Sequence, residues 1–270
     1  MTTRSTRGEA NRRRAWVTGA SAGIGAAFAR RLAHDGWDLA LVARDRARLK
    51  SLAAELQHAH AIRAEVFAAD LTDVAARAGI EAALADDARL ELLVNNAGFG
   101  TMGAFATLPI AQEEAEIALN IVALSRLTRA ALPGLMARRR GAILNVSSLA
   151  AFQPGPQNAT YAATKAFVNS FSESLHEELR GSGVRVMALC PGFTRTEFQE
   201  RAGIDVSGIP SFAWMSAEAV VDAALAGLRR GDVVCVPGAS NWLLSNVVSA
   251  LPRAAVRRVL GAASKRVLNR

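Results

Sequence analysis

Short apolar runs alternate with longer segments in which apolar residues recur at helical spacing over most of this chain. The runs have the length of buried strands and cover residues 14–18, 38–44, 64–71, 90–98, 141–148, 184–190 and 232–237. Helical patterns cover about 23–34, 45–59, 111–138, 158–180 and 216–230, and another begins near Thr72. Strands that alternate with helices predict an α/β domain built on a parallel sheet.

Composition supports this prediction. With 270 residues and 51% apolar side chains, the chain can bury one large core, and no linker divides it. Cys190 and Cys235 have no metal-ligand spacing, so we expect reduced thiols, no metal and a cytoplasmic location. We find no apolar secretory segment and no apolar run long enough to span a bilayer.

Positive charge is concentrated at the two ends of the chain. Of a net charge of +8, residues 1–14 carry +4, the segment from Val233 onward carries +6, and the body between them carries −2. A strongly basic protein often binds nucleic acid, but the nearly neutral body argues against that partner. We expect residues 1–12 to be a disordered basic lead-in.

The first predicted strand runs directly into a glycine-rich loop that opens the first helix. Its sequence is Gly19-Ala-Ser21-Ala-Gly23-Ile24-Gly25. Backbone N–H groups at a helix N-terminus attract an anion, and glycines let that anion approach closely. A strand, a glycine loop and a helix in this order indicate a dinucleotide-binding unit rather than a plain tight turn.

The end of the second strand bears on which dinucleotide binds. An acidic residue there would bind the ribose 2′-hydroxyl of NAD, whereas an arginine can meet the 2′-phosphate of NADP. Arg44 stands at this position, so we expect NADP, with NAD less favoured, and Ser21 could add a hydroxyl donor. Arg46 and Arg48 are better explained as the solvated start of the next helix.

Polar residues also end later strands, at the sheet edge where ligands lie in doubly wound folds. Asp70 could bond adenine or cap the following helix, and Asn95 and Asn96 end the fourth strand. Asn120 lies among apolar residues of a predicted helix. A buried amide must be satisfied, so Asn120 is either a structural hydrogen bonder or a site residue.

Tyr161 and Lys165 are four residues apart and share one face of a predicted helix. An ammonium about 4 Å from a phenol favours the phenolate by roughly 4 kcal/mol at an effective dielectric near 20, or about three pKa units. That shift would make Tyr161, the only tyrosine of the chain, a usable acid and base. Alone, the spacing would more often mean an exposed pair without chemistry.

Together these motifs resemble the short-chain dehydrogenase/reductase family over about residues 14–237. The resemblance rests on T-G-A-S-A-G-I-G from Thr18, Asp70, N-N-A-G from Asn95, Asn120, Ser148, Y-x-x-x-K from Tyr161 and P-G-F-T-R-T from Pro191. It implies a single Rossmann-type catalytic domain over 13–238, with a doubly wound, seven-stranded parallel sheet and helices on both faces. It also implies a homodimer or homotetramer, and the arginine after the second strand resembles the NADP-preferring subset.

The resemblance further implies a role for each matching residue. Tyr161 would exchange a proton with the substrate oxygen, and Lys165 would lower the Tyr161 pKa and bind the nicotinamide ribose. Ser148, whose spacing from Tyr161 suits the family better than that of Ser147, would orient the substrate, and Asn120 would hold a water of the proton path. The implied cofactor contacts are Gly19, Ser21, Gly23, Ile24, Gly25, Arg44, Asp70, Leu71, Asn95, Ala97, Gly98, Tyr161, Lys165, Pro191, Gly192, Thr194 and Thr196.

The expected activity is therefore NADP(H)-dependent interconversion of a carbonyl and an alcohol, by default a reduction, without a metal. Residues 193–215 mix apolar side chains such as Phe198, Ile204 and Trp214 with polar ones, which suits a lid over an apolar substrate. Acyl chains, steroid-like rings and aromatic ketones all stay open as substrates.

Two other functions are less favoured. Gly19-Ala-Ser21-Ala-Gly23 matches the serine-hydrolase elbow, but no oxyanion segment accompanies it, and His176 falls on the helix of Tyr161. A non-catalytic NADP-binding sensor or scaffold on the same fold would often have lost the tyrosine or the lysine, and both are present here.

Residues 239–270 are expected to form a basic amphipathic helical extension that Pro252 interrupts. Apolar residues from Trp242 to Leu251 recur at helical spacing, and Arg257 and Arg258 follow. These helices could pack on the domain or on a partner subunit, which we favour. They could also lie on an anionic membrane surface, which would place the protein at the inner membrane face.

Overall fold

The computed structural model describes residues 12–203 and 208–268 of the chain. Residues 1–11 of the expected lead-in and Ile204 of the expected lid lie outside the described residues. Within the described part, no helix has both the length and the apolar character needed to cross a membrane.

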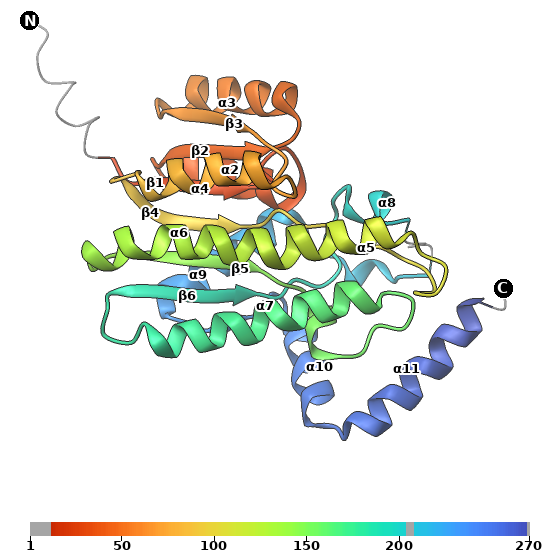
Figure 1. Ribbon diagram of the computed structural model, residues 1–270. Coiled ribbons are helices and arrows are strands. Elements are labelled where there is room, and N and C mark those ends of the chain that lie inside the picture. Colours follow the sequence, from red (N-terminus) through yellow and green to blue (C-terminus); the bar gives the residue numbers. More distant parts are fainter. Residues whose placement is uncertain (1–11, 204–207, 269–270) are drawn as a thin grey trace, which may run out of the picture.

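Seven strands form one sheet in the order β3-β2-β1-β4-β5-β6-β7, as Figure 1 shows. They are β1 (Arg14–Thr18), β2 (Asp38–Ala43), β3 (Ala64–Ala68), β4 (Leu90–Asn95), β5 (Gly141–Val146), β6 (Val184–Leu189) and β7 (Val234–Cys235). Each neighbouring pair is parallel. The predicted doubly wound, seven-stranded sheet is confirmed, and its strand order reverses between β1 and β4, where such folds bind ligands.

Helices cover both faces of the sheet (Figure 1). The longer ones are α2 (Gly23–His34), α3 (Arg46–His60), α4 (Val74–Ala85), α5 (Ile110–Ile117), α6 (Leu124–Ala137), α7 (Ala159–Glu178) and α9 (Ala217–Arg230). Phe28, Leu49 and Val220, from α2, α3 and α9, belong to one buried apolar cluster. Ile80 of α4 and Leu127 of α6 belong to the cluster on the opposite face.

Side chains cap the first turns of α3, α4 and α9, but not the first turn of α2. Asp45, Asp73 and Ser216 each accept a backbone N–H in the first turn of α3, α4 and α9. Ala22 stands at the same position before α2 and offers no such acceptor. The first-turn N–H groups of α2 therefore face the sheet edge without a side-chain cap.

The predicted continuous helix over 111–138 is divided into three parts. A π-helical segment, η1 (Ala118–Ala123), separates α5 from α6 and carries Asn120, whose exposure is 1%. A π-helical turn shifts the side chains that follow it relative to a regular helix, and such turns are frequent at functional sites. Sequence periodicity did not reveal this interruption.

The C-terminal extension forms two helices separated at Pro252, as expected. They are α10 (Ala239–Ala250) and α11 (Arg253–Leu268), and α11 projects away from the sheet in Figure 1. On α10, Trp242, Leu243, Leu244 and Val247 are about half exposed. The described part of the extension therefore buries few of the apolar side chains that recur there at helical spacing.

Candidate active site

The glycine loop packs against β4 so closely that two of its positions require glycine. Gly19 has φ of +66°, and a Cβ on Gly25 would lie 2.2 Å from the Gly19 carbonyl oxygen. Asn96 Nδ2 donates to the carbonyl oxygens of Thr18 and Gly19 at 2.9 and 3.3 Å. With α2 uncapped and its first turn free of acidic residues, this donor set fits an anionic phosphate group.

Thr18 joins β1 to β4 at the point where the strand order reverses. Its hydroxyl oxygen accepts from the N–H groups of Asn96 and Ala97, both at 3.0 Å, and the hydroxyl donates to the Val94 carbonyl at 3.3 Å. The position of residues 96–98 is therefore set by β1, and sequence reasoning assigned no role to Thr18 or Asn96 side chains.

The arginine expected to meet a 2′-phosphate stands just after β2. The Arg44 side chain is 78% exposed, and its Nη1 lies 3.9 Å from Asp70 Oδ2. Burial raises the pKa of Asp70, but bonds from Thr72 and the Arg44 charge outweigh burial and leave that pKa below its usual range. Asp70 accepts from Thr72 N and Oγ1 at 2.9 and 2.7 Å, while Asp73 caps α4.

Asn95 differs from the other expected cofactor contacts because its side chain is engaged in the core. It is 3% exposed, and Nδ2 donates to Thr128 Oγ1 at 3.0 Å and to Asn145 Oδ1 at 2.9 Å. These bonds link β4 to β5 and α6. The neighbouring Asn96, rather than Asn95, bonds the glycine loop.

Tyr161, Lys165, Ser148 and Asn120 converge at the carboxyl edge of the sheet from α7, the end of β5 and η1. Lys165 Nζ donates to the Val146 carbonyl at 2.8 Å and lies 5.5 Å from the Tyr161 ring centroid. The cluster unites residues that are up to 45 positions apart in the sequence.

The Asn120 amide is fully used within this cluster. Its Nδ2 donates to the Phe99 carbonyl at 2.8 Å and to Thr164 Oγ1 at 3.1 Å, and its Oδ1 accepts from Phe99 N at 3.2 Å. Asn120 therefore ties the segment after β4 to α7. Of the two alternatives raised from the sequence, these bonds show the structural amide, and the role as a site residue stays a prediction.

Two glycines let the segment after β4 lie directly against the cluster. A Cβ on Gly98 would stand 2.9 Å from Asn120 Oδ1 and 3.4 Å from Lys165 Nζ. A Cβ on Gly100 would stand 2.8 Å from Tyr161 Cδ2. Larger residues would displace the polar groups, so the packing at this edge depends on these glycines.

Protonation of Tyr161 differs from what its spacing to Lys165 suggested. Burial raises the pKa of Tyr161 to about 12, although part of the residue stays accessible, and a hydrogen bond to Ser148 acts in the opposite direction. Burial likewise lowers the pKa of Lys165 to about 8. Burial therefore opposes the predicted effect of Lys165 on the Tyr161 pKa, because loss of water disfavours both charged forms.

The two serines after β5 have different partners. Ser147 is buried and donates to the Lys165 carbonyl oxygen at 2.9 Å, so it holds the α7 backbone. Ser148 is half-buried, accepts from Ala150 N at 3.1 Å and bonds Tyr161. This geometry favours Ser148 over Ser147 as the hydroxyl beside Tyr161.

The segment after β6 approaches the glycine loop. Thr194, 4% exposed, donates to the Gly192 carbonyl at 3.0 Å, and the Pro191 carbonyl accepts from Leu149 N at 3.0 Å. A Cβ on Gly23 would lie 3.2 Å from Thr196 Cβ. The segment after β6 therefore packs against the glycine loop.

The described part of the lid brings aromatic rings to the cluster. Its short helix α8 (Phe198–Arg201) places the Phe198 ring centroid 5.6 Å from that of Tyr161. Phe193 and Trp214 form a second aromatic pair, also 5.6 Å apart. Arg48 is exposed as expected, but its Nη1 lies 3.0 Å from both carboxylate oxygens of Glu197, which joins α3 to the start of the lid.

The first turn of the extension contacts the segment after β6. Asn241 Nδ2 donates to the Pro237 carbonyl at 2.9 Å, and a Cβ on Gly192 would lie 2.7 Å from the same Nδ2. The domain boundary expected at residue 238 therefore separates two segments that are in contact.

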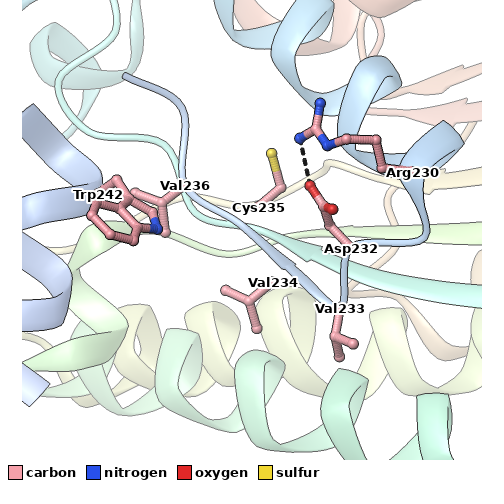
Figure 2. Close-up of a pocket in the computed structure, with 7 residues that line it drawn as sticks. All are labelled: Arg230, Asp232, Val233, Val234, Cys235, Val236 and Trp242. Carbon is pink, nitrogen blue, oxygen red and sulfur yellow. Dashed lines mark hydrogen bonds and ion pairs between the residues drawn. The ribbon is translucent and has the colours of Figure 1, made fainter. Parts of the chain in front are cut away.

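A cavity of about 490 Å³ lies beside β7, away from the predicted site residues. Figure 2 shows the residues that line it: Arg230, Asp232, Val233, Val234, Cys235, Val236 and Trp242. Burial raises the pKa of the Cys235 thiol to about 11, so the thiol stays protonated at neutral pH. Across the described residues, no group of three His, Cys, Asp or Glu side chains could hold a metal ion.

Comparison with known proteins gives concordant matches. The family model described as short chain dehydrogenase matches residues 13–206. The very-long-chain 3-oxoacyl-CoA reductase of Anas platyrhynchos is 33% identical over 94% of this chain and 81% of its own length.

Two solved structures are similar over nearly the whole chain. A short-chain dehydrogenase from Sphingobium yanoikuyae, in complex with NADPH, is 40% identical with a TM-score of 0.81, covering 90% of this chain and 97% of its own. A bulky-bulky ketone specific alcohol dehydrogenase from Comamonas testosteroni is 34% identical with a TM-score of 0.77, covering 93% and 99%.

The contact between Gly25 and Gly19 can be tested directly. In Gly25→Ala the new Cβ would meet the Gly19 carbonyl at 2.2 Å, so the loop must move, and we expect NADPH affinity to fall roughly tenfold or more. Titration of NADPH fluorescence measures this. Gly79→Ala in α4 is the control, because a Cβ there meets nothing within 4 Å. Equal affinity of both variants would contradict the assignment of the loop.

Proposed function

The chain belongs to the short-chain dehydrogenase/reductase family of oxidoreductases, and from this membership we propose that it reduces bulky apolar ketones or aldehydes with NADPH, and performs the reverse oxidation with NADP. The observation that carries the proposal is the convergence of Tyr161, Ser148, Lys165 and Asn120 beside the glycine loop. A phosphate-binding loop and a proton-transfer group at the same edge of the sheet suit hydride chemistry on a carbonyl.

The residues that would hold the cofactor fit its chemistry. The uncapped N-terminus of α2 and the loop from Gly19 to Gly25 would take the pyrophosphate. Arg44 would meet the 2′-phosphate, and Thr194 and Thr196 would contact the nicotinamide side. NADPH, when bound, supplies the hydride. The related Sphingobium enzyme is described in complex with NADPH, which supports the same cofactor here.

The side chains of the cluster divide the work on the carbonyl oxygen. Tyr161 gives its proton to that oxygen, and Ser148, which bonds Tyr161, orients the oxygen by donating to it. Lys165 supplies positive charge behind the tyrosine, and Asn120 holds the segment of Gly98 against Lys165. A Tyr161 whose pKa is about 12 stays protonated at neutral pH, which suits it to give a proton in the reducing direction.

The lid supports a bulky, apolar substrate. Phe198 lies beside Tyr161, and Phe193 and Trp214 of the same lid pack together. Aromatic side chains offer large apolar contact areas to a hydrophobic substrate. The related Comamonas enzyme is described as specific for bulky-bulky ketones, which makes ketones with two large substituents the first class to examine.

A panel of ketones graded in size tests the proposed reaction. We expect NADPH consumption with bulky aryl and alicyclic ketones, and little with acetone. In Tyr161→Phe the proton donor is lost while the ring stays, so kcat should fall roughly 10²- to 10⁴-fold with NADPH affinity unchanged. Normal turnover of Tyr161→Phe would remove Tyr161 from the mechanism. Absence of any turnover in the unaltered chain would instead favour the non-catalytic sensor.

The choice of NADP over NAD depends on Arg44. We expect Arg44→Ala to raise the KM for NADPH roughly 10- to 100-fold, because a charge-assisted bond to the 2′-phosphate is lost, and to leave the KM for NADH nearly unchanged. Arg46→Ala is the matched control, since Arg46 is also an exposed arginine and lies two residues after Arg44. Equal loss for both cofactors, or an equal effect of Arg46→Ala, would contradict this role.

For the partner, we propose that the exposed apolar stripe of α10 is covered by a second copy of the chain rather than by an anionic membrane surface. Leu243→Gln combined with Val247→Gln should then shift sedimentation velocity from dimer or tetramer toward monomer, because both side chains are about half exposed on the stripe. The polar, exposed Ser249→Gln is the control. An unchanged oligomer with lost co-sedimentation on anionic vesicles would favour the membrane.

A further inference from the structure

Two glutamates of α5 are buried beside the active site, although neither belongs to the predicted catalytic set. Glu113 is 2% exposed and Glu116 is fully buried. Buried carboxylates are normally paired with a cation. Among the described residues, no arginine or lysine forms an ion pair with either one, so their carboxyl groups must be satisfied in another way.

Hydroxyl groups take the place of the cation. Thr101 Oγ1 lies 2.6 Å from Glu113 Oε1 and 2.8 Å from Glu116 Oε2, and Thr101 N donates to Glu116 Oε2 at 2.9 Å. The Thr160 hydroxyl at the start of α7 donates to Glu113 Oε2. Because the Thr101 hydroxyl has one proton, it can donate to only one of the two carboxyls. The other short contact requires a proton on that second carboxyl.

Glu116 stands at the end of this cluster nearest the catalytic residues. It lies one helical turn before Asn120, which contacts the Gly98 segment next to Lys165. Glu116 Oε1 is buried and has no hydrogen-bond partner among the described residues. Its charge acts on both Tyr161 and Lys165. A carboxylate with one unpaired oxygen here would influence their protonation strongly.

We propose that the carboxyl groups of Glu113 and Glu116 hold a single proton between them across the Thr101 hydroxyl, and that Glu116, when ionised, is a positioning residue that keeps Lys165 charged and Tyr161 protonated. The second part rests on the proposed function, since it concerns the proton that Tyr161 gives to the carbonyl oxygen. The first part concerns the folded chain alone.

The groups that face this cluster support the same assignment. Burial raises the pKa of Glu116, the bonds from Thr101 lower it, the charge of Glu113 raises it, and Lys165 lowers it. Cys190, at the end of β6, faces Tyr161 and Lys165, and burial raises its pKa to about 12, so the thiol is neutral. Glu113, Lys165 and Tyr161 are thus the charged or titratable groups that face Glu116.

The shared proton is tested without any enzymatic activity. A carboxyl whose folded-state pKa is raised stabilises the fold below its unfolded pKa of about 4, and that stability is lost as pH rises through the folded pKa. Glu116→Gln has no carboxyl that ionises at this position, so its stability should not show this loss. The urea midpoint of the unaltered chain should therefore fall relative to Glu116→Gln as pH rises from about 4 to 8.

Glu114→Gln is the control for this measurement, because Glu114 is exposed on the same helix. Its urea midpoint should run parallel to that of the unaltered chain over the whole pH range. Parallel curves for Glu116→Gln as well would overturn the shared proton. If Glu116→Gln does not fold, Thr101→Val is compared instead; it keeps both carboxyls and removes the hydroxyl between them, and an unchanged pH dependence would overturn the proposal.

The effect on catalysis is read from the pH profile of carbonyl reduction with NADPH. Loss of the Glu116 charge lets both Lys165 and Tyr161 lose their protons more easily, so the alkaline limb of kcat should move down by about one pH unit. Thr101→Val should move it in the same direction by less, and Glu114→Gln should not move it.

A fall in kcat for Glu116→Gln with an unmoved alkaline limb would assign Glu116 a merely structural role and overturn its part in catalysis. Failure of the proposed function looks different, because the unaltered chain then reduces no ketone at any pH. In that case the urea measurement still decides whether the buried carboxyls share a proton.

Discussion

Removal of water from ionisable side chains is the constraint that governs the carboxyl edge of this sheet. Tyr161, Lys165 and Glu116 lie within one cluster, and burial is the first cause of the pKa shift of each. Burial keeps a phenol and a carboxyl protonated and favours loss of the proton from an ammonium. All three groups therefore favour their neutral forms. Their protonation then depends on which neighbours restore charge, rather than on the spacing of any one pair.

The fold produces this dry edge by close backbone packing. Gly19, Gly25, Gly98 and Gly100 each lie where a Cβ would meet another part of the site at 3.0 Å or less. Parallel strands deliver all of these segments to the same edge of the sheet, where the strand order reverses between β1 and β4. The same close packing surrounds Lys165, which is 5% exposed.

Much of this arrangement was predictable from the sequence, because it follows from the spacing of apolar residues and from the order of strands and helices. Apolar runs predicted every strand, with β7 shorter than expected, and the alternation with helices predicted the parallel sheet. The motif residues at strand ends were also predictable, since the carboxyl ends of parallel strands meet at one edge. Their roles toward cofactor and substrate stay predictions, including the choice of Ser148 over Ser147, which the geometry supports.

Features that depend on three-dimensional packing were not predictable in this way. The π-helical turn at Asn120 leaves no trace in periodicity, and Asn95 and Asn96 are adjacent amides whose partners differ only in the fold. In the sequence, the pattern around Glu113 and Glu116 is that of the polar face of an ordinary helix. The raised pKa of Tyr161 was not predictable, because spacing gives the distance to a charge but not the cost of burial.

The sole tyrosine of the chain makes the central claim directly measurable. Ionisation of Tyr161 can be followed by the near-ultraviolet absorbance of tyrosinate, with circular dichroism confirming at each pH that the chain stays folded. If burial dominates, Tyr161 stays protonated above the usual tyrosine pKa of about 10 and ionises only toward pH 12 or on unfolding. Ionisation of the folded chain at or below pH 10 would contradict the account.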